Sequence, residues 1–131
     1  MWSLPLEKSQ NGAQAGRRRW ALAKASGRPP PNFCDHAAVA TGLRVLLLGG
    51  SSATEGYMPL DALFAWDTQH AAWSRLQCGG AVPRARAGHV AAAAHGAAGW
   101  RVYIFGGGNS SSGFDDLLVL DEACSWRRLM P

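Results

Sequence analysis

Short apolar runs separated by turn-forming residues follow one another along most of this chain. Two of these runs, 45–48 and 102–105, are continuously apolar, and each is followed by a double glycine. A continuous apolar run of this length predicts a strand that is buried on both faces. Segments rich in Leu, Val and Phe and flanked by aspartate come next, at 61–67 and 115–121. Because the 3.6-residue period of an amphipathic helix is absent, we expect short β-strands, with a helix as an alternative only within 13–26.

The tryptophans reveal an internal repeat, which is the feature that decides the fold class of such a sequence. Trp20, Trp73 and Trp126 follow one another at intervals of 53 residues. His36 and His89 share this interval, and each lies 16 residues after a tryptophan of the set. Each complete unit therefore holds four segments that predict strands: one after the histidine, the apolar run, the aspartate-flanked segment and the segment that carries the tryptophan.

Four short strands in a unit of about 50 residues are typical of one blade of a β-propeller. The order of double glycine, aspartate-flanked strand and tryptophan resembles the Kelch repeat, over nearly the whole chain. The resemblance implies an all-β fold of Kelch-type blades, each with four antiparallel strands, in an incomplete, open propeller. We expect a partial blade with strands three and four at 1–28, a blade at 29–79 and another at 80–131.

The residues that recur once per unit are interpreted as architecture. Glycine pairs suit positive φ or close backbone approach, and each tryptophan is expected to pack between blades and to bury roughly 200 Å². Each histidine is expected to make one structural hydrogen bond per blade, and each aspartate to cap a turn. The predicted structural residues are Trp20, His36, Gly49, Gly50, Asp67, Trp73, His89, Gly106, Gly107, Asp121 and Trp126.

Composition and charge narrow the function classes. Charged residues make up 17% of the chain, the net charge is +4, and the only basic run is Arg17–Arg19. That run is too short to indicate nucleic-acid binding, and no apolar segment predicts a signal peptide or a membrane span. Three cysteines in unrelated contexts, with no zinc-site spacing, indicate free thiols in a reducing compartment. We expect a cytoplasmic protein, with the nucleus as an alternative, and no metal or cofactor.

Two catalytic interpretations are alternatives to the structural one for some of these residues. The glycines at 106–108 precede serines, but a phosphate-binding loop needs a following helix or a Gly-Lys-Ser/Thr sequence, and neither is present. Galactose oxidase, a copper enzyme, shares the Kelch-type architecture, and Tyr57, Tyr103, Cys78 and the histidines would be its candidate copper-site residues here. The predicted function is not enzymatic, because nothing catalytic stands apart from the repeat.

The predicted function is protein–protein interaction through loops that emerge on one face. These loops join strands two and three of each blade, and one blade to the next. Their Arg side chains can bind carboxylates bidentately and their Ser side chains can add polar bonds, so the predicted partner is an acidic peptide or loop. The predicted contact residues are Ser51, Ser52, Tyr57, Arg84, Arg86, Asn109, Ser110 and Ser111.

The number of blades raises the question of completeness. Propellers close with roughly four to eight blades, and two and a half cannot close. We therefore expect a fragment of a longer protein, or a chain that completes its ring with other subunits. The sequence resembles Kelch proteins that carry acyl-CoA-binding or F-box domains, which implies as an alternative the substrate-recognition part of a ubiquitin-ligase adaptor or of an acyl-CoA-binding protein.

Overall fold

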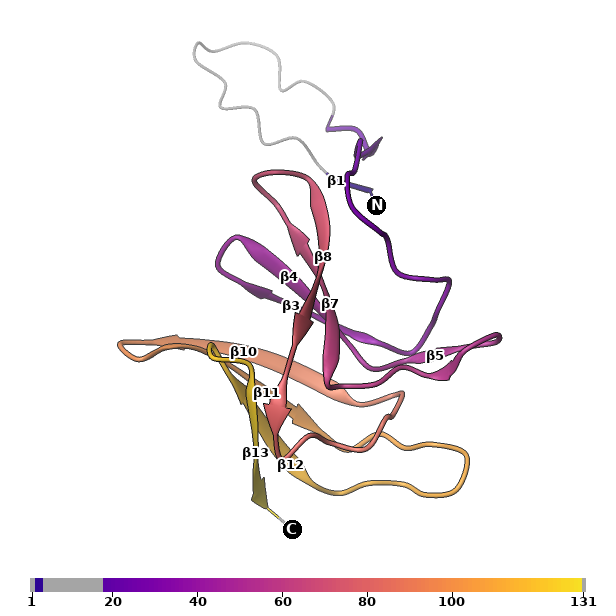
Figure 1. Cartoon of the computed structure of the whole chain (residues 1–131), viewed down its shortest axis with the longest axis vertical. Coiled ribbons are helices and arrows are strands. Elements are labelled where there is room, and N and C mark those ends of the chain that lie inside the picture. The colour runs from indigo at the N-terminus through magenta and orange to yellow at the C-terminus, as the bar shows by residue number, and fades with distance from the viewer. Residues whose placement is uncertain (1, 4–17, 131) are drawn as a thin grey trace.

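The structure, a computed structural model, describes residues 2–3 and 18–130, and every regular element in them is a β-strand (Figure 1). This confirms the all-β prediction. The first large sheet is antiparallel, with its four strands in chain order. They are β3 (Ala37–Thr41), β4 (Arg44–Leu48), β7 (Ala62–Asp67) and β8 (Ala72–Gln77).

The second large sheet repeats this order and gains one strand. Its antiparallel strands are β10 (Val90–Gly96), β11 (Gly99–Phe105), β12 (Leu117–Asp121) and β13 (Ser125–Met130). A short fifth strand, β9 (Gly79–Gly80), pairs in parallel with β13 at the outer edge. The inner strands β3 and β10 of the two sheets lie next to each other. The arrangement is that of two neighbouring blades with no closed ring.

Two small antiparallel pairs complete the described strands. One is the hairpin of β5 (Ser51–Ser52) and β6 (Gly56–Tyr57). The other joins β1 (Trp2–Ser3) to β2 (Ala21–Leu22), which lies directly after Trp20. The rest of the predicted third strand of the partial blade, and residues 13–17 of the stretch considered for a helix, lie outside the described residues. Residues 18–26 contain no helix.

The aspartates that end β7 and β12 cap the turns that follow these strands, which is the role the repeat predicts. Asp67 Oδ1 accepts hydrogen bonds from the backbone N–H groups of Gln69 and His70, at 2.8 and 2.9 Å. Asp121 Oδ1 accepts from Ala123 and Ser125 at 3.0 and 3.1 Å. Each carboxylate thus satisfies backbone donors that the turn leaves free.

The segment after β8 crosses from the first sheet to the second. Gly79 N–H donates to the Cys124 carbonyl at 2.9 Å, and Ala81 N–H to the Trp126 carbonyl at 2.8 Å. The same kind of crossing occurs one unit earlier in the chain, where Ser26 forms a parallel bridge with Ala72 of β8. Gly80 has a φ of 77°, and a Cβ there would lie 2.5 Å from the Trp126 carbonyl oxygen, so the crossing requires glycine. The outer strand of each sheet, β8 or β13, is therefore hydrogen-bonded to residues that come before that sheet in the sequence.

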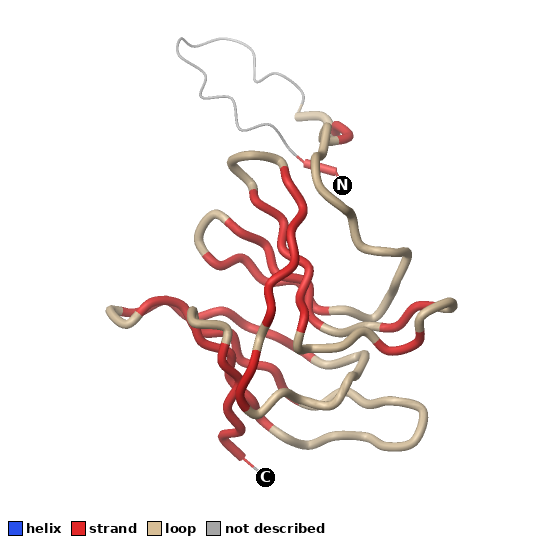
Figure 2. Tube along the Cα trace, in the orientation of Figure 1, coloured by secondary structure: helices blue, strands red, loops and turns tan. Residues whose placement is uncertain are grey.

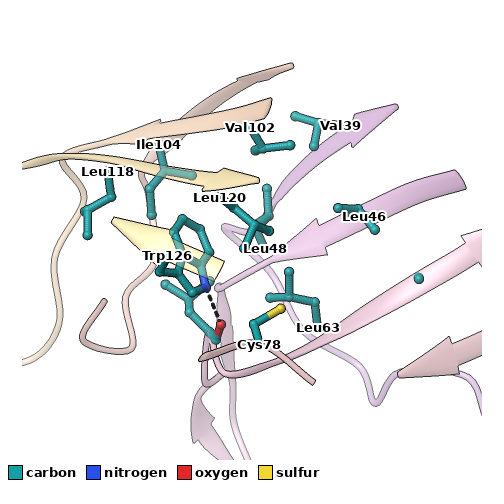
Figure 3. Packing of buried hydrophobic residues seen from close by; sticks show 12 residues of the cluster. Val39, Leu46, Leu48, Leu63, Cys78, Val102, Ile104, Leu118, Leu120 and Trp126 are labelled. Atoms are coloured by element: carbon teal, nitrogen blue, oxygen red, sulfur yellow. Dashed lines mark hydrogen bonds between the residues drawn. The ribbon is translucent and has the colours of Figure 1, made fainter. Parts of the chain in front are cut away.

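The main hydrophobic core lies between the two sheets (Figure 3). Leu46, Leu48 and Leu63 of the first sheet meet Ile104 and Trp126 of the second, and all five are almost fully buried. Trp126 also donates its indole N–H to the Leu60 carbonyl at 2.8 Å. This confirms that Trp126 packs between blades.

The other two tryptophans of the repeat do not pack in this way. Trp73 is half-buried and stacks on Trp66 of its own sheet, with ring centroids 5.1 Å apart. Trp20 is 65% exposed. Among the described residues, no third large sheet lies against Trp73 or Trp20, so packing between blades stays a prediction for these two.

The face of the second sheet that points away from the first sheet carries the residues that are equivalent, in the repeat, to those that the first sheet turns toward the second. Phe105 occupies the repeat position of Leu48, and Val90 that of Ala37. Leu48 is fully covered by the second sheet, whereas Phe105 is 51% exposed and Val90 66%. The second sheet therefore leaves uncovered the apolar face that its counterpart buries against a neighbour.

Candidate functional site

The three predicted binding loops meet at one end of the two sheets, where the double glycines end β4 and β11 (Figure 2). Gly50 N–H donates to the Arg86 carbonyl at 2.8 Å, which joins the first loop to the connection between sheets. The next residue, Ala87, forms an antiparallel bridge with Gly108 of the third loop. The connecting segment thus lies between the other two loops, and backbone hydrogen bonds link all three into one surface.

The loop after β11 is held closed by one asparagine side chain. Asn109 Oδ1 accepts hydrogen bonds from the backbone N–H groups of Ser111 and Ser112 and from the Ser111 hydroxyl, each at 3.0 Å. The loop after β4 is instead the β5–β6 hairpin, in which Ser51 pairs with Tyr57. Ser51, Ser52, Tyr57 and Asn109 are half-buried, while Ser110 and Ser111 are exposed. Preformed loops of this kind present polar side chains at little cost in ordering entropy.

The second glycine of each pair makes room for the histidine of its unit. A Cβ at Gly107 would lie 2.6 Å from the Ala87 carbonyl oxygen and 2.9 Å from the His89 Cβ. A Cβ at Gly50 would meet Cys34 and His36 in the same way, at 2.7 and 2.9 Å. The contact between glycine and histidine is thus the structural role that recurs in both units.

Among the described residues, neither histidine has a side-chain hydrogen bond short and straight enough to be the one that the repeat predicts. His36 is exposed and stacks on Phe33, with centroids 4.3 Å apart. His89 is buried, and neither ring nitrogen has a hydrogen-bond partner among the described residues. Burial lowers the pKa of His89, and the nearby Arg86 charge lowers it further, although the Leu48 carbonyl opposes the shift. His89 therefore lies neutral at the boundary between the sheets.

Arg86 is the centre of a buried ion pair at this end of the second sheet. Its guanidinium binds the Asp116 carboxylate with two hydrogen bonds, of 2.5 and 3.1 Å, and both side chains are almost fully buried. It also donates to the carbonyls of Arg84 and Gly106 at 3.1 and 3.0 Å and lies over the Phe114 ring. The Arg86 hydrogen bond, ahead of that of Arg128, lowers the pKa of Asp116 to about 2.

This placement corrects the prediction that Arg86 contacts a partner. Its charge is already neutralised by Asp116, and its side chain is 1% exposed, so it cannot receive a carboxylate from outside. Arg84 is exposed, as a contact residue must be. A comparison of the two units could have indicated the Arg86–Asp116 pair, because the first unit has the uncharged Phe33 and Ala62 at the two corresponding positions. The two charges appear together in the second unit and are absent together from the first.

A cavity of about 400 Å³ opens beside this ion pair. Val82, Pro83, Phe114 and Leu118 give it apolar walls, and Arg84 and Arg128 add charged ones. Arg128 is 58% exposed and donates to Asp116 Oδ2 at 3.0 Å. The four ionisable residues that line the cavity, three arginines and one aspartate, leave it net positive. The sequence did not identify Asp116, Phe114 or Arg128, since Phe114 and Asp116 lie just before β12, Arg128 lies within β13, and none is at the tip of a loop.

The described residues contain neither a cluster of metal-ligating side chains nor a membrane-spanning helix. Within residues 2–3 and 18–130, no three His, Cys, Asp or Glu side chains gather as potential metal ligands. The tyrosines and the cysteine considered for a copper site come from three different segments: Tyr57 lies in β6, Tyr103 in β11 and Cys78 directly after β8. The part of the chain that the structure describes also contains no helix of the length and hydrophobicity needed to cross a bilayer.

The comparison with protein families decides the assignment. The model of the KLHDC2/KLHL20/DRC7 Kelch-repeats domain matches residues 2–131. This chain belongs to the Kelch-repeat family. The match explains why the double glycines, aspartates and tryptophans recur, and it makes the Kelch-type propeller blade the unit of this fold.

Several curated proteins are similar to this Kelch chain. It is 33% identical over 110 residues to acyl-CoA-binding domain-containing proteins 5 and 4 of Arabidopsis thaliana, which covers 83% of the chain and 16% of each relative. It is also 33% identical over 103 residues to the mouse Rab9 effector protein with kelch motifs, covering 76% of the chain and 26% of the relative. The chain thus spans between about a sixth and a quarter of the length of these relatives.

Proposed function

We propose that this Kelch chain is a protein-interaction module that binds an acidic segment of a partner protein at the cavity beside Arg86. The observation that carries the proposal is the position of Arg84 and Arg128, two exposed guanidinium groups on a cavity whose other walls are apolar. Guanidinium groups bind carboxylates bidentately, and apolar walls suit the neighbouring side chains of the same segment.

The buried Arg86–Asp116 pair supports this proposal by fixing the shape of the cavity. Arg86 holds the carbonyls of Arg84 and Gly106, and Asp116 holds the Arg128 guanidinium, so the backbone at Arg84 and the side chain of Arg128 are both fixed before binding. Groups that are ordered before binding lose less entropy when the partner arrives. In this interpretation Arg86 acts as a positioning residue, and the contact residues are Arg84 and Arg128.

The names of the similar proteins are compatible with an interaction role. The two Arabidopsis relatives are named for an acyl-CoA-binding domain, and the mouse relative for its action as a Rab9 effector. What this chain shares with all three is a segment that makes up a minor part of each. We therefore propose that the shared segment supplies recognition of a protein, and that acyl-CoA binding or ligase recruitment would belong to other domains.

The test is selection of peptides from a random display library on the immobilised chain. We expect the recovered peptides to be enriched in Asp and Glu next to apolar residues. In a titration with one selected peptide, Arg84→Ala should weaken binding about fivefold to tenfold, in line with about 1 kcal/mol for one charged contact. The affinity should also fall with added salt, because exposed charges are screened.

The matched control is Arg44→Ala, which removes an exposed arginine from the end of β4 remote from the double glycine. This variant should bind the selected peptide as the unmodified chain does. The proposal is wrong if the recovered peptides show no excess of acidic residues, or if Arg84→Ala and Arg44→Ala have equal effects.

A further inference from the structure

The fold brings together two cysteines that lie far apart in the sequence. Cys78 lies between β8 and β9, and Cys124 lies in the turn that precedes β13. The parallel pairing of β9 with β13 sets Gly79 opposite Ser125 and Gly80 opposite Trp126. One step back along both segments, the same register sets Cys78 opposite Cys124, and Gly79 N–H donates to the Cys124 carbonyl at 2.9 Å.

This spacing fits a disulfide. Neighbouring strands lie roughly 4.8 Å apart, and disulfides join residues whose Cα atoms are about 4.4–6.8 Å apart. Cys78 is 4% exposed and belongs to the core between the sheets, and the half-buried Cys124 packs against that core. The two thiols also interact: burial raises the pKa of Cys78 to about 12, and the charge and hydrogen bonding of the Cys124 thiol add to the shift.

We propose that Cys78 and Cys124 form a reversible disulfide that ties the two blades together. The bond would join the end of the outer strand of the first sheet to the turn before the outer strand of the second. The proposal concerns the boundary between the blades and is independent of the proposed partner.

Glutathione disulfide is a sufficient oxidant for the two steps. The Cys124 thiolate attacks one sulfur of glutathione disulfide, whose S–S bond breaks and releases one glutathione thiolate. Cys78 then loses its proton and attacks Cys124 Sγ, which breaks the mixed disulfide and releases the second glutathione thiolate. The two protein thiols lose two electrons and two protons in total, and the oxidant takes up both as two glutathione molecules.

The structure also sets the order of these steps. Cys124 is half-buried and can meet the oxidant, whereas Cys78 is shielded by the core. Once Cys124 carries glutathione it can no longer bear a negative charge, and one of the causes that raise the pKa of Cys78 disappears. The first step thus makes the second easier.

The test uses a Cys34→Ala variant, because Cys34 is an exposed free thiol that would react on its own. This protein is equilibrated in glutathione buffers of rising oxidised fraction, quenched with acid, alkylated and analysed by mass spectrometry. We expect both remaining thiols to disappear together, with a loss of two hydrogen masses and a peptide pair linked through Cys78 and Cys124. The linked chain should unfold at a higher urea concentration than the reduced chain.

Two controls make the result decisive. In Cys34→Ala/Cys124→Ser, Cys78 should remain free to alkylation after unfolding at every buffer composition, while far-UV circular dichroism shows that the sheets persist. The same oxidation in urea should give less of the linked species, since the unfolded chain does not hold the two sulfurs together. Glutathione on Cys124 with Cys78 still free, or equal linkage in urea, would overturn the proposal.

Discussion

The indole N–H of Trp126, in the outer strand of the second sheet, donates a 2.8 Å hydrogen bond to the backbone carbonyl of Leu60, in the segment that leads into β7 of the first sheet. Both residues are 1% exposed, so water cannot replace this bond. Trp126 also fills the space between the sheets beside Leu48 and Leu120 (Figure 3). One side chain therefore supplies both apolar packing and a polar link across the boundary between blades.

Replacement of Trp126 should separate these two contributions. Trp126→Phe keeps much of the packing but leaves the Leu60 carbonyl unpaired, and we expect it to lower the free energy of unfolding by about 2–3 kcal/mol. Trp126→Ala also opens a cavity and should cost about 3–5 kcal/mol. Urea denaturation followed by circular dichroism measures both. The exposed Trp20 provides the control, since Trp20→Phe should change the free energy of unfolding by less than about 0.5 kcal/mol.

Removal of one charge from the Arg86–Asp116 pair should be strongly destabilising. Asp116→Asn leaves the Arg86 guanidinium buried without its counter-charge, which typically costs about 3–5 kcal/mol. The low pKa of Asp116 has a related consequence in acid. Because this carboxyl is more acidic in the folded chain than in the unfolded one, its stabilising contribution is complete above about pH 4 and is lost as the pH falls toward 2.

A double replacement tests whether the pair as such is needed for folding. The first unit has Phe33 and Ala62 at the corresponding positions, so Arg86→Phe/Asp116→Ala copies a combination that this fold already uses. We expect the double variant to be more stable than Asp116→Asn. If it were as unstable as the single variant, the pair would contribute more than mutual neutralisation.

The buried His89 predicts a loss of stability in mild acid. Its pKa is lower in the folded chain than in the unfolded chain, where a histidine titrates near 6.5. The unfolded chain therefore takes up the proton first, and stability is complete above about pH 6.5 and decreases as the pH falls below it. We expect the urea midpoint of the unmodified chain to fall between pH 7 and pH 5 by more than that of His89→Gln.

His95→Gln is the matched control for this measurement, because it removes an exposed histidine at the far end of β10 that is not among the groups acting on His89. Its urea midpoint should follow the same pH dependence as the unmodified chain. An identical pH dependence for all three proteins would show that His89 does not titrate at the boundary between the sheets.

The uncovered apolar face of the second sheet predicts self-association in solution. Val90, Phe105 and Met130 are each more than half exposed, and contiguous exposed apolar surface of this kind favours association. We expect the apparent mass in size-exclusion chromatography with light scattering to rise with protein concentration. Phe105→Thr should reduce this rise, whereas Leu43→Thr, which alters an exposed apolar residue in the β3–β4 turn, should not. A monomer at all concentrations would contradict the prediction.

The internal repeat allowed the sequence to predict most of the fold. Strands, their order within each sheet and the turn caps at Asp67 and Asp121 follow from residues that both units share. The burial of Arg86 could not be predicted in this way. A repeat is informative at positions where its units have the same residue, and the two units differ at the positions of Arg86 and Asp116. The contact residues were expected at loop tips, whereas Arg128 reaches the cavity from β13.

Two further features depend on contacts between units. Cys78 and Cys124 occupy different positions within their units, so only the crossing of β9 to the second sheet brings them together. The unpaired ring nitrogens of His89 also had no sequence signal, since a histidine that recurs in a repeat usually indicates a shared hydrogen bond. Here it is the contact with Gly50 or Gly107 that recurs.

The crossing of β9 has a consequence for how such a chain can assemble during synthesis on the ribosome. The outer strands β8 and β13 are each completed by hydrogen bonds from residues that are translated before their own sheet, around Ser26 and Gly79. Each blade can therefore complete its edge as soon as its own fourth strand emerges, without waiting for later residues. The apolar face at Phe105 and Val90 behaves differently, because none of the described residues covers it. Assembly of these blades thus has a direction, from the amino terminus toward the carboxyl terminus.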